Sequence, residues 1–158
     1  MNNLEIERKF LVDVTSWNAL EKKQGDLYLQ GYLGIDEDKA IRVRLAKGKG
    51  YLTIKGRSDT CAHPEYEYEI PFSDAQELII AYCANSVEKV RYRIPVGKHV
   101  WEVDVFRGKN EGLIVAEIEL NDPEEPFERP SWVGEEVTSN SRYYNASLSQ
   151  NPLSTWQK

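Results

Sequence analysis

Hydrophobic and polar positions alternate along most of this chain, which predicts β-strands because successive strand side chains point to opposite faces. The first alternating run covers residues 5–11, where Glu5, Glu7 and Lys9 share one face. Later runs repeat this pattern at residues 41–45, 51–55, 65–70, 89–94, 101–105 and 116–120. The sequence therefore predicts a mainly β protein in which each of these strands has one strongly polar face.

The polar faces carry charges of both signs. Their carboxylates are Glu5, Glu7, Glu65, Glu67, Glu69, Glu102, Asp104, Glu117 and Glu119. Their cations are Lys9, Arg42, Arg44, Lys55, Lys89, Arg91 and Arg93. The aromatic residues expected in the core, on the opposite faces, are Tyr66, Tyr68, Tyr92 and Trp101. One charged face is usually the solvated side of a sheet, but so many strands with apolar backs favour a closed barrel, with charges inside and helices packed outside.

Turn and helix signals divide the strands. Glycine-containing turns that predict antiparallel hairpins fall at residues 47–50, 95–98 and 107–110. A helix is expected from the N-cap Ser73 to about Ala84, with a shorter one at residues 15–22 and a helical turn at residues 142–148. Residues 121–130 are rich in Pro and Glu and are expected to form a loop.

Length and composition limit the classes of protein that need to be considered. The 158 residues fit a single domain over residues 1–158, and no apolar run approaches the length of a membrane span. Charged residues near the start stand where a secretory signal needs an apolar stretch, so we expect a cytoplasmic protein. Cys61 and Cys83 lie far apart and indicate neither a disulfide framework nor a zinc site. A net charge of −6 argues against binding of nucleic acid or anionic membranes.

The mixture of charges on the polar faces favours a polyphosphate ligand bound together with divalent metal. Arginine matches phosphate oxygens, whereas carboxylates hold Mg²⁺ or Mn²⁺. Two carboxylate pairs, Glu5 with Glu7 and Glu117 with Glu119, could hold one or two such ions. A chain with only two histidines is a poor candidate for a zinc hydrolase, and the lack of a GxxxxGKS or GxxxxGKT sequence excludes a P-loop.

An ordered series of motifs resembles a known family. Glu5-Ile6-Glu7-Arg8-Lys9 matches the ExExK signature of the CYTH superfamily, also called triphosphate tunnel metalloenzymes. The motifs that follow in order are Gln30-Gly31-Tyr32-Leu33, Arg42-Val43-Arg44, Thr53-Ile54-Lys55, Glu67-Tyr68-Glu69, residues 88–93, residues 101–106 and Ala116-Glu117-Ile118-Glu119-Leu120. The resemblance covers nearly the whole chain and is greatest to the short bacterial members. It implies a closed eight-stranded antiparallel tunnel that hydrolyses inorganic triphosphate with Mg²⁺ or Mn²⁺.

The chain departs from the family pattern near its C-terminus. Many relatives carry an acidic residue before an Arg-Tyr pair, whereas here Ser139-Asn140-Ser141 precedes Arg142-Tyr143. The charged residues of the predicted tunnel are unaffected by this difference.

The resemblance implies a role for each charged position. The residues expected to bind phosphoryl oxygens are Lys9, Arg42, Arg44, Lys55, Lys89 and Arg91. The residues expected to hold metal are Glu5, Glu7, Glu117 and Glu119, and the supporting tunnel residues are Glu67, Glu69, Arg93, Glu102 and Asp104. Tyr32 follows the flexible Gly31 and is expected near Lys9, which would favour the phenolate and make Tyr32 a base for the attacking water. The alternatives are structural ion pairs across the barrel and, for Tyr32, a packed aromatic residue.

Other functions remain open on the sequence alone. Within the superfamily these are a class IV adenylyl cyclase and a thiamine or nucleoside triphosphatase. A cyclase needs a pocket for adenine, and no aromatic platform is evident on the charged faces. A module that binds polyphosphate or a nucleotide without turnover is the non-enzymatic alternative, although the carboxylates would weaken passive anion binding. The expected partner is a small triphosphate, and the chain is expected to be a monomer or a homodimer.

Overall fold

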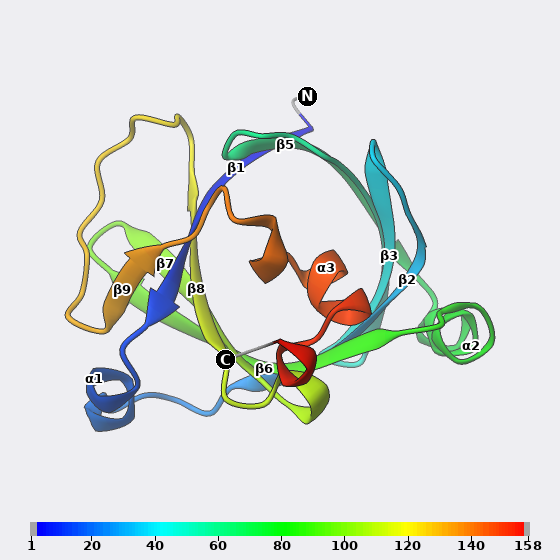
Figure 1. Ribbon diagram of the computed structural model, residues 1–158, viewed down its shortest axis with the longest axis horizontal. Helices are drawn as coiled ribbons and strands as arrows, with labels where there is room; N and C mark the ends of the chain where they lie inside the picture. The colour runs from blue at the N-terminus through cyan, green and yellow to red at the C-terminus, as the bar shows by residue number, and fades with distance from the viewer. Residues whose placement is uncertain (1–2, 157–158) are drawn as a thin grey trace.

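The computed structural model describes residues 3–156, and its central feature is a closed ring of antiparallel β-strands (Figure 1). The strands of the ring are β1 (Leu4–Val12), β2 (Asp26–Ile35), β3 (Lys39–Ala46), β4 (Lys49–Gly56), β5 (Ala62–Ile70), β6 (Ser86–Val96), β7 (His99–Phe106) and β8 (Ile114–Leu120). They follow the order β5-β4-β3-β2-β6-β7-β8-β1, and pairing of β1 with β5 closes the barrel. The predicted eight-stranded antiparallel barrel is therefore confirmed.

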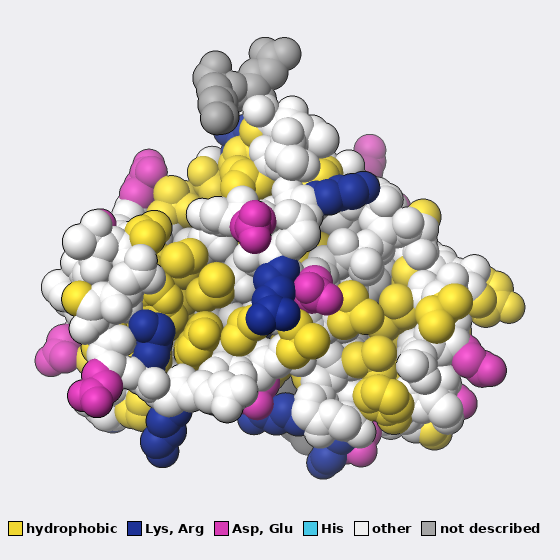
Figure 2. Space-filling view, turned by 90° about the horizontal axis from the view of Figure 1, so that it is seen from below, with side chains coloured by type: hydrophobic (Ala, Val, Ile, Leu, Met, Phe, Trp, Pro, Cys, Tyr) yellow, Lys and Arg dark blue, Asp and Glu magenta, His cyan; other side chains and the backbone are white. Residues whose placement is uncertain are grey.

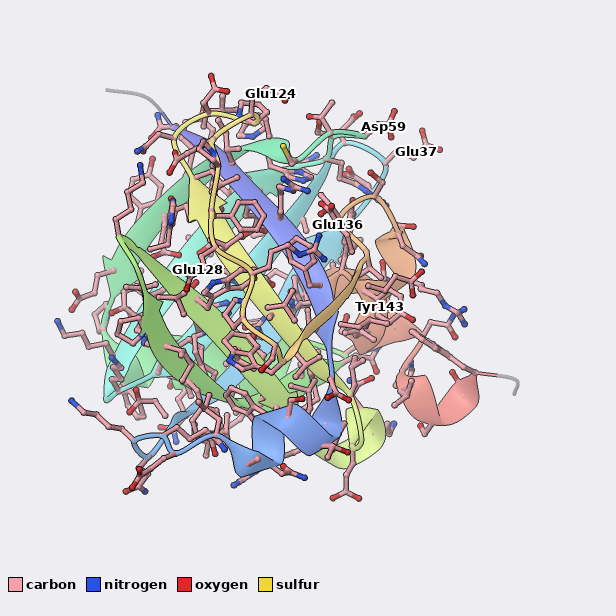
Figure 3. All side chains as sticks on the ribbon, turned by 90° about the vertical axis from the view of Figure 1, so that its left-hand side faces the viewer. Glu37, Asp59, Glu124, Glu128, Glu136 and Tyr143 are labelled. Carbon is pink, nitrogen blue, oxygen red and sulfur yellow. The ribbon has the colours of Figure 1, made fainter. Side chains whose placement is uncertain are left out.

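Two strands had no charged face by which to predict them. The inward positions of β2 are Tyr28, Gln30 and Tyr32, which are uncharged, so β2 was indicated only by its family motif. The ninth strand, β9 (Val133–Glu136), is too short for a clear period and pairs with the C-terminal half of β1. In Figure 3, Glu136 of β9 lies beside β1, where its carboxylate accepts hydrogen bonds of 2.8 and 2.6 Å from Arg8.

The helices lie close to their predicted positions. They are α1 (Val14–Ala19), α2 (Phe72–Tyr82) and α3 (Asn145–Gln150), with 3-10 turns at Gly108–Asn110, Ser141–Tyr143 and Leu153–Thr155. Asp13 caps α1 by accepting a hydrogen bond from the backbone N–H of Ser16. Ser73 is not the N-cap of α2, because the helix begins one residue earlier, after Pro71. In the part of the chain that the structure describes, no helix has the length and apolar character needed to span a membrane.

The main hydrophobic core lies outside the barrel wall, as the apolar backs of the strands predict. It is formed by Phe10, Trp17, Trp101, Val103, Ala116, Ile118, Leu120 and Trp132, which are all buried. Rings in this cluster meet edge to face, with Trp101 and Trp132 centroids 5.6 Å apart. The cluster joins α1 and the 127–132 segment to the outward faces of β1, β7 and β8.

Helix α2 covers the outward faces of β2, β3 and β4. The approach is close: a Cβ on Gly50 would lie 2.6 Å from Cβ of Ala75, and one on Gly31 would lie 2.7 Å from Cβ of Cys83. Gly31 is therefore needed for packing rather than for the flexibility expected from the sequence.

The prediction that Tyr66 and Tyr68 are core residues is wrong. They are 42% and 56% exposed on the outward face of β5, which lies beyond the strands that α2 covers. Trp101 is fully buried as predicted, and Tyr92 packs against the main core. Other large apolar side chains are also exposed, notably Ile80 at 79% and Tyr82 at 71%, and Figure 2 shows apolar patches among charges on one face.

Helix α3 differs from the other two because it closes the barrel from within. At one end of the barrel the inward faces change from charged to apolar, and Val87, Phe106 and Val115 pack there with the fully buried Leu148 of α3. Figure 1 shows α3 inside the ring of strands. The prediction of helices outside the barrel thus holds for α1 and α2, and α3 in addition forms part of the wall of the interior.

Candidate active site

Two adjoining cavities occupy the inside of the barrel. The first has a volume of about 270 Å³ and reaches the C-terminal segment, and the second has about 580 Å³ and lies toward the other end of the strands. The residues that line both are Glu5, Arg44, Glu65, Arg91 and Glu102. We call the two cavities together the tunnel.

The first cavity has an excess of positive charge. The cations that line it are Lys9, Arg42, Arg44, Lys55, Arg57, Lys89 and Arg91. The carboxylates that line it are Glu5, Glu7, Glu65, Glu102 and Glu117. All the predicted phosphate-binding residues therefore meet in one cavity, together with three of the predicted metal-binding residues.

The remaining predicted residues lie around this cavity. Glu67, Arg93 and Glu119 line the second cavity, where Arg93 donates to the Tyr28 hydroxyl at 3.1 Å. Asp104 is buried beneath the cavities and lines neither. The prediction that Glu69 supports the tunnel is corrected by the structure. Glu69 lines neither cavity because it lies at the end of β5, where it is exposed and pairs with Lys49 at 3.7 Å.

Asp104 holds two of the cations in place. Its carboxylate accepts hydrogen bonds from Arg91 Nε and Nη2 at 2.8 and 2.9 Å and pairs with Lys89 Nζ at 2.7 Å. Asp104 and Lys89 are 1% and 0% exposed. Burial alone would raise the pKa of Asp104, but the charges of Arg91 and Lys89 hold this pKa well below its usual value. Lys89 also donates to Asn145 of α3 at 2.9 Å, so the wall helix is tied to this ion pair.

Gln30 positions Arg44 and was missed by the sequence analysis. Its side-chain oxygen accepts hydrogen bonds from Arg44 Nε and Nη2 at 3.0 and 2.9 Å, and its amide nitrogen donates to the Tyr32 hydroxyl at 3.0 Å. Burial, aided by the charges of Arg42 and Arg91, lowers the pKa of Arg44 to about 9, and the guanidinium stays ionised at neutral pH. Arg44 is thus a cavity-lining cation whose hydrogen-bond partner is neutral, as expected of a group that binds an anion.

Arg42 has carboxylate partners but retains one donor that no described residue satisfies. Its guanidinium reaches Glu67 at 3.3 Å and Glu65 at 3.8 Å and bonds Thr53 at 3.2 Å. Its Nε is buried and has no hydrogen-bond partner among the described residues. A buried unsatisfied donor is costly, and an oxygen of a bound phosphate would satisfy it.

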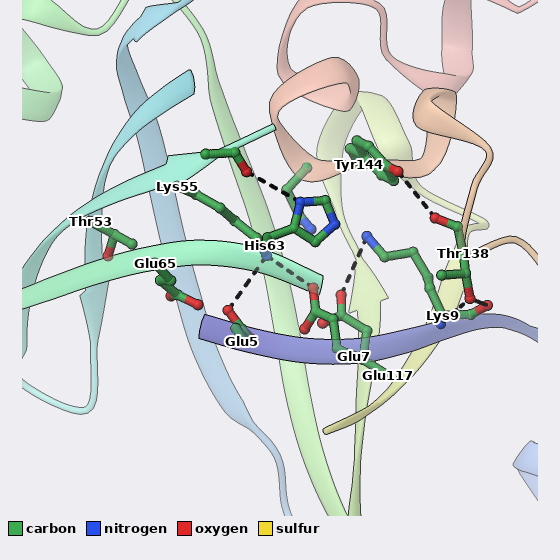
Figure 4. Close-up of polar contacts among 12 residues, drawn as sticks. Glu5, Glu7, Lys9, Thr53, Lys55, His63, Glu65, Glu117, Thr138 and Tyr144 are labelled. Atoms are coloured by element: carbon green, nitrogen blue, oxygen red, sulfur yellow. Dashed lines mark hydrogen bonds and ion pairs between the residues drawn. The ribbon is translucent and has the colours of Figure 1, made fainter. Parts of the chain in front are cut away.

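The carboxylates of β1 and β8 meet near two lysines (Figure 4). Lys55 Nζ lies 3.0 Å from Glu7 and 3.6 Å from Glu5, and Lys9 Nζ lies 3.5 Å from Glu117. A side-chain hydrogen bond joins Glu7 to Glu117. Burial and the charge of Glu7 raise the pKa of Glu117. Burial would also raise the pKa of Glu7, but Lys55 and Lys9 hold it well below its usual value. Glu7 and Glu117 therefore form a close pair of carboxyl groups whose pKa values shift in opposite directions.

These carboxylates fit a hard divalent cation only in part. Glu5 Oε2 is buried without a hydrogen-bond partner among the described residues, and Glu7 and Glu117 lie close by. Within residues 3–156, however, no three Asp, Glu, His or Cys side chains are grouped closely enough to hold a metal ion alone. This arrangement suits Mg²⁺ or Mn²⁺, because such ions are often held by one or two carboxylates together with water and substrate phosphates.

Tyr32 and Lys9 line the same cavity, but Lys9 contacts the C-terminal segment as well as Glu117. Lys9 Nζ donates to the carbonyl oxygen of Tyr143 at 3.3 Å and lies 5.1 Å from the centre of the Tyr144 ring. The Tyr32 hydroxyl accepts a hydrogen bond from Gln30 instead. Tyr32 can therefore act as a base only when substrate and the attacking water lie beside its hydroxyl.

The structure adds residues that no charged pattern could indicate. His63, Thr138, Tyr144 and Asn145 line the first cavity. Tyr144 and Asn145 come from the C-terminal segment, where the sequence has no strand period. Gln30 offered a weak signal, since it lies two residues before Tyr32 and must share its face.

Comparison with known proteins identifies the family. Residues 3–152 match the CYTH domain model. The chain is 46% identical over 155 residues to an inorganic triphosphatase of Acetivibrio thermocellus, with 98% of each chain covered. It is 35% identical over 153 residues to an inorganic triphosphatase of Nitrosomonas europaea, with 91% of this chain and 95% of the relative covered. This protein belongs to the CYTH domain family.

A solved structure agrees with this assignment. The crystal structure of an inorganic triphosphatase shares 32% identity and a TM-score of 0.64 with this chain. The match covers 92% of this chain and 93% of that chain. This chain therefore shares its fold with an inorganic triphosphatase whose structure has been determined.

Proposed function

We propose that this protein is a metal-dependent inorganic triphosphatase that cleaves triphosphate to pyrophosphate and phosphate inside the first cavity. The observation that carries the proposal is the excess of cations over carboxylates in the first cavity, above all Arg44, whose hydrogen-bond partner is the neutral Gln30. A compact polyanion supplies the missing charge. The two curated relatives described above are both named inorganic triphosphatases, which supports the same substrate.

The cations of the first cavity bind the phosphoryl oxygens. Arg44 is held by Gln30, whereas Lys89 and Arg91 are held by Asp104, so these donors are ordered before substrate enters. Ordered donors lose little conformational entropy on binding and stabilise charge that develops at the reacting phosphoryl group. Arg57 is exposed at the edge of the cavity, where it meets the incoming anion.

Mg²⁺ or Mn²⁺ would be held by carboxylates among Glu5, Glu7, Glu117 and Glu119, together with water and substrate oxygens. When bound, such an ion would neutralise phosphate charge and polarise the phosphoryl group.

Tyr32 takes the proton of the attacking water. Its hydroxyl oxygen faces the first cavity and accepts a hydrogen bond from Gln30, an interaction that stabilises negative charge on this oxygen. Removal of the proton increases the nucleophilicity of the water as it approaches the terminal phosphorus.

A nucleoside triphosphate is the second candidate substrate, because the second cavity has aromatic residues that the sequence analysis overlooked. Tyr28 and Tyr51 line it. The guanidinium groups of Arg44 and Arg91 lie 5.0 and 4.9 Å from the centre of the Tyr28 ring and compete with a base for that surface. Tyr51 is the aromatic residue against which a base could stack.

The test compares substrates and metals. Phosphate release is measured with triphosphate, ATP and thiamine triphosphate, each in Mg²⁺, in Mn²⁺ and in EDTA, and the products are separated to detect cyclic AMP. We expect triphosphate to be cleaved well ahead of ATP, and only with metal. Full turnover in EDTA contradicts the metal requirement, and cyclic AMP as the main product contradicts the proposed reaction.

A matched pair of variants tests the metal-binding role. Glu117→Gln keeps the size of a buried side chain and removes a ligand charge, so we expect activity to fall far more than thermal stability does. Glu69→Gln is the control because Glu69 lies outside the cavities. Equal losses of activity and stability in Glu117→Gln would identify a structural ion pair with Lys9 instead.

A further inference from the structure

His63 is a buried polar residue of the first cavity to which the proposed function gives no role. It lies in β5 opposite Glu5 of β1, where these two strands close the barrel. The residue is only 8% exposed, yet its side chain lines the first cavity. Figure 4 shows the ring above Glu7, between the side chains of Lys55 and Tyr144.

The hydrogen bonds of the ring determine which nitrogen carries the proton. Nδ1 lies 3.2 Å from the carbonyl oxygen of Gly56, which can only accept, so Nδ1 donates and Nε2 presents a lone pair. Burial and the charge of Lys55 lower the pKa of His63, which favours this neutral form. The Tyr144 ring meets the imidazole at 90°, with centroids 6.2 Å apart, and helps to fix its orientation.

The Nε2 atom is an unused acceptor in a cavity filled with donors. No described residue donates a hydrogen bond to Nε2. The hydrogen bond from Nδ1 to the carbonyl oxygen of Gly56 fixes the direction in which the Nε2 lone pair points. A lone pair repels phosphate oxygens, so this atom cannot help the cations to bind the substrate. Among the described residues it belongs to no group of three side chains that could hold a metal ion alone. A water O–H is a donor that fits this lone pair.

We propose that His63 is a positioning residue that accepts a hydrogen bond at Nε2 from the attacking water and aims its oxygen at the terminal phosphorus. This proposal rests on the proposed function. The water oxygen forms a new bond to phosphorus, and the bond from phosphorus to the bridging oxygen breaks. Its electron pair leaves on pyrophosphate. One hydrogen of the water stays on that oxygen, hydrogen-bonded to Nε2, and leaves with the phosphate. The other passes as a proton to the phenolate of Tyr32, so His63 need not change its charge.

Three substitutions separate this role from a structural one. The amide oxygen of His63→Gln can take the place of Nε2, whereas His63→Asn reaches only the Nδ1 position and keeps the bond to Gly56. His63→Phe keeps the ring and removes both nitrogens. Each variant is first checked for its melting temperature and for stabilisation by triphosphate, which report folding and substrate binding without turnover.

We expect His63→Asn and His63→Phe to lower kcat by about 10- to 100-fold, the loss typical of a misplaced reactant, with KM within about threefold of wild type. His63→Gln should recover most of kcat. The role is overturned if His63→Asn retains wild-type kcat, because the Gly56 bond alone would then suffice. It is also overturned if His63→Gln is as impaired as His63→Asn, or if only KM changes.

The wild-type protein separates failure of this inference from failure of the proposed function. Wild type that binds triphosphate but does not cleave it would refute the proposed function, and the positioning role with it. Active wild type together with a His63→Phe variant of normal kcat would refute the positioning role alone. If His63→Phe does not fold, the comparison of His63→Gln with His63→Asn still decides the question.

Discussion

Replacement of Asp104 by asparagine tests how much the folded state depends on one buried carboxylate that balances two buried cations. Asp104 is the buried carboxylate that holds both Lys89 and Arg91, at 2.7 and 2.8 Å. Asparagine keeps the shape of the side chain but removes the negative charge. Among the described residues, Lys89 keeps its hydrogen bond to Asn145 but no charged partner within ion-pair distance, and Arg91 keeps Glu102 at 3.4 Å. Two buried cations are left close together without a full counter-charge.

The expected loss is large because both cations stay out of water. Removal of one partner from a buried ion pair costs about 3–5 kcal/mol in the free energy of unfolding. For a domain of this length, that loss lowers the melting temperature by about 6–20 °C. Glu69→Gln is the matched control, because its ion pair with Lys49 is more than half exposed on both sides and should contribute less than about 1 kcal/mol.

The assay is thermal unfolding with and without triphosphate. A bound polyanion supplies part of the negative charge that Asp104→Asn lacks, so triphosphate should raise the melting temperature of this variant more than that of wild type, provided binding is saturated. If Asp104→Asn loses no more stability than Glu69→Gln, then Lys89 and Arg91 do not depend on Asp104. Equal stabilisation of wild type and variant by triphosphate would separately contradict contact between these cations and the substrate.

Three further predictions address binding, chemistry and pH. Arg44→Ala should raise KM and reduce kcat, with a combined loss on the order of 2–4 kcal/mol in kcat/KM; steady-state kinetics with normal KM would contradict phosphate contact. Tyr32→Phe should lower kcat by roughly 100-fold and alter the basic limb of the pH–rate profile, and near-normal kcat would show that Tyr32 only packs. Burial and the charges of Glu67 and Glu119 raise the pKa of Glu65 to about 7, above its usual 4.5. The folded state therefore binds this proton more tightly than the unfolded state, and the stability that results is lost as pH rises through 7. Because Glu65→Gln cannot lose a proton, its melting temperature should rise relative to that of wild type between about pH 5 and 8. A constant difference would refute this.

The sequence alone was sufficient for the barrel and for most of the charged interior. A period of two places Glu5, Glu7 and Lys9 on one face whatever the strand packs against, and the same holds for Arg42 and Arg44. Once several strands have charged faces and apolar backs, a barrel with the charges inside is the arrangement that covers the apolar side. The local pattern therefore determined which residues face the tunnel.

The tertiary structure decided where each charged face leaves the tunnel and which apolar faces are covered. Glu69 shares a face with Glu67 but lies past the end of the cavities, and Tyr68 is exposed because α2 packs mainly on β2, β3 and β4. Whether a face is covered depends on where distant segments pack, which a strand pattern does not encode.

Contacts between distant segments also explain how α3 closes the barrel and which residues hold the cations of the site. Helix α3 closes one end of the barrel because Leu148 packs on inward apolar residues of strands far away in the sequence. Gln30 beneath Arg44 and Asp104 between Lys89 and Arg91 are pairings across strands, set by register. His63 shows the limit most clearly, because its lone pair is directed by the carbonyl of Gly56 on a neighbouring strand. Residue type and period determined the inward charges, whereas contacts between distant segments determined their partners.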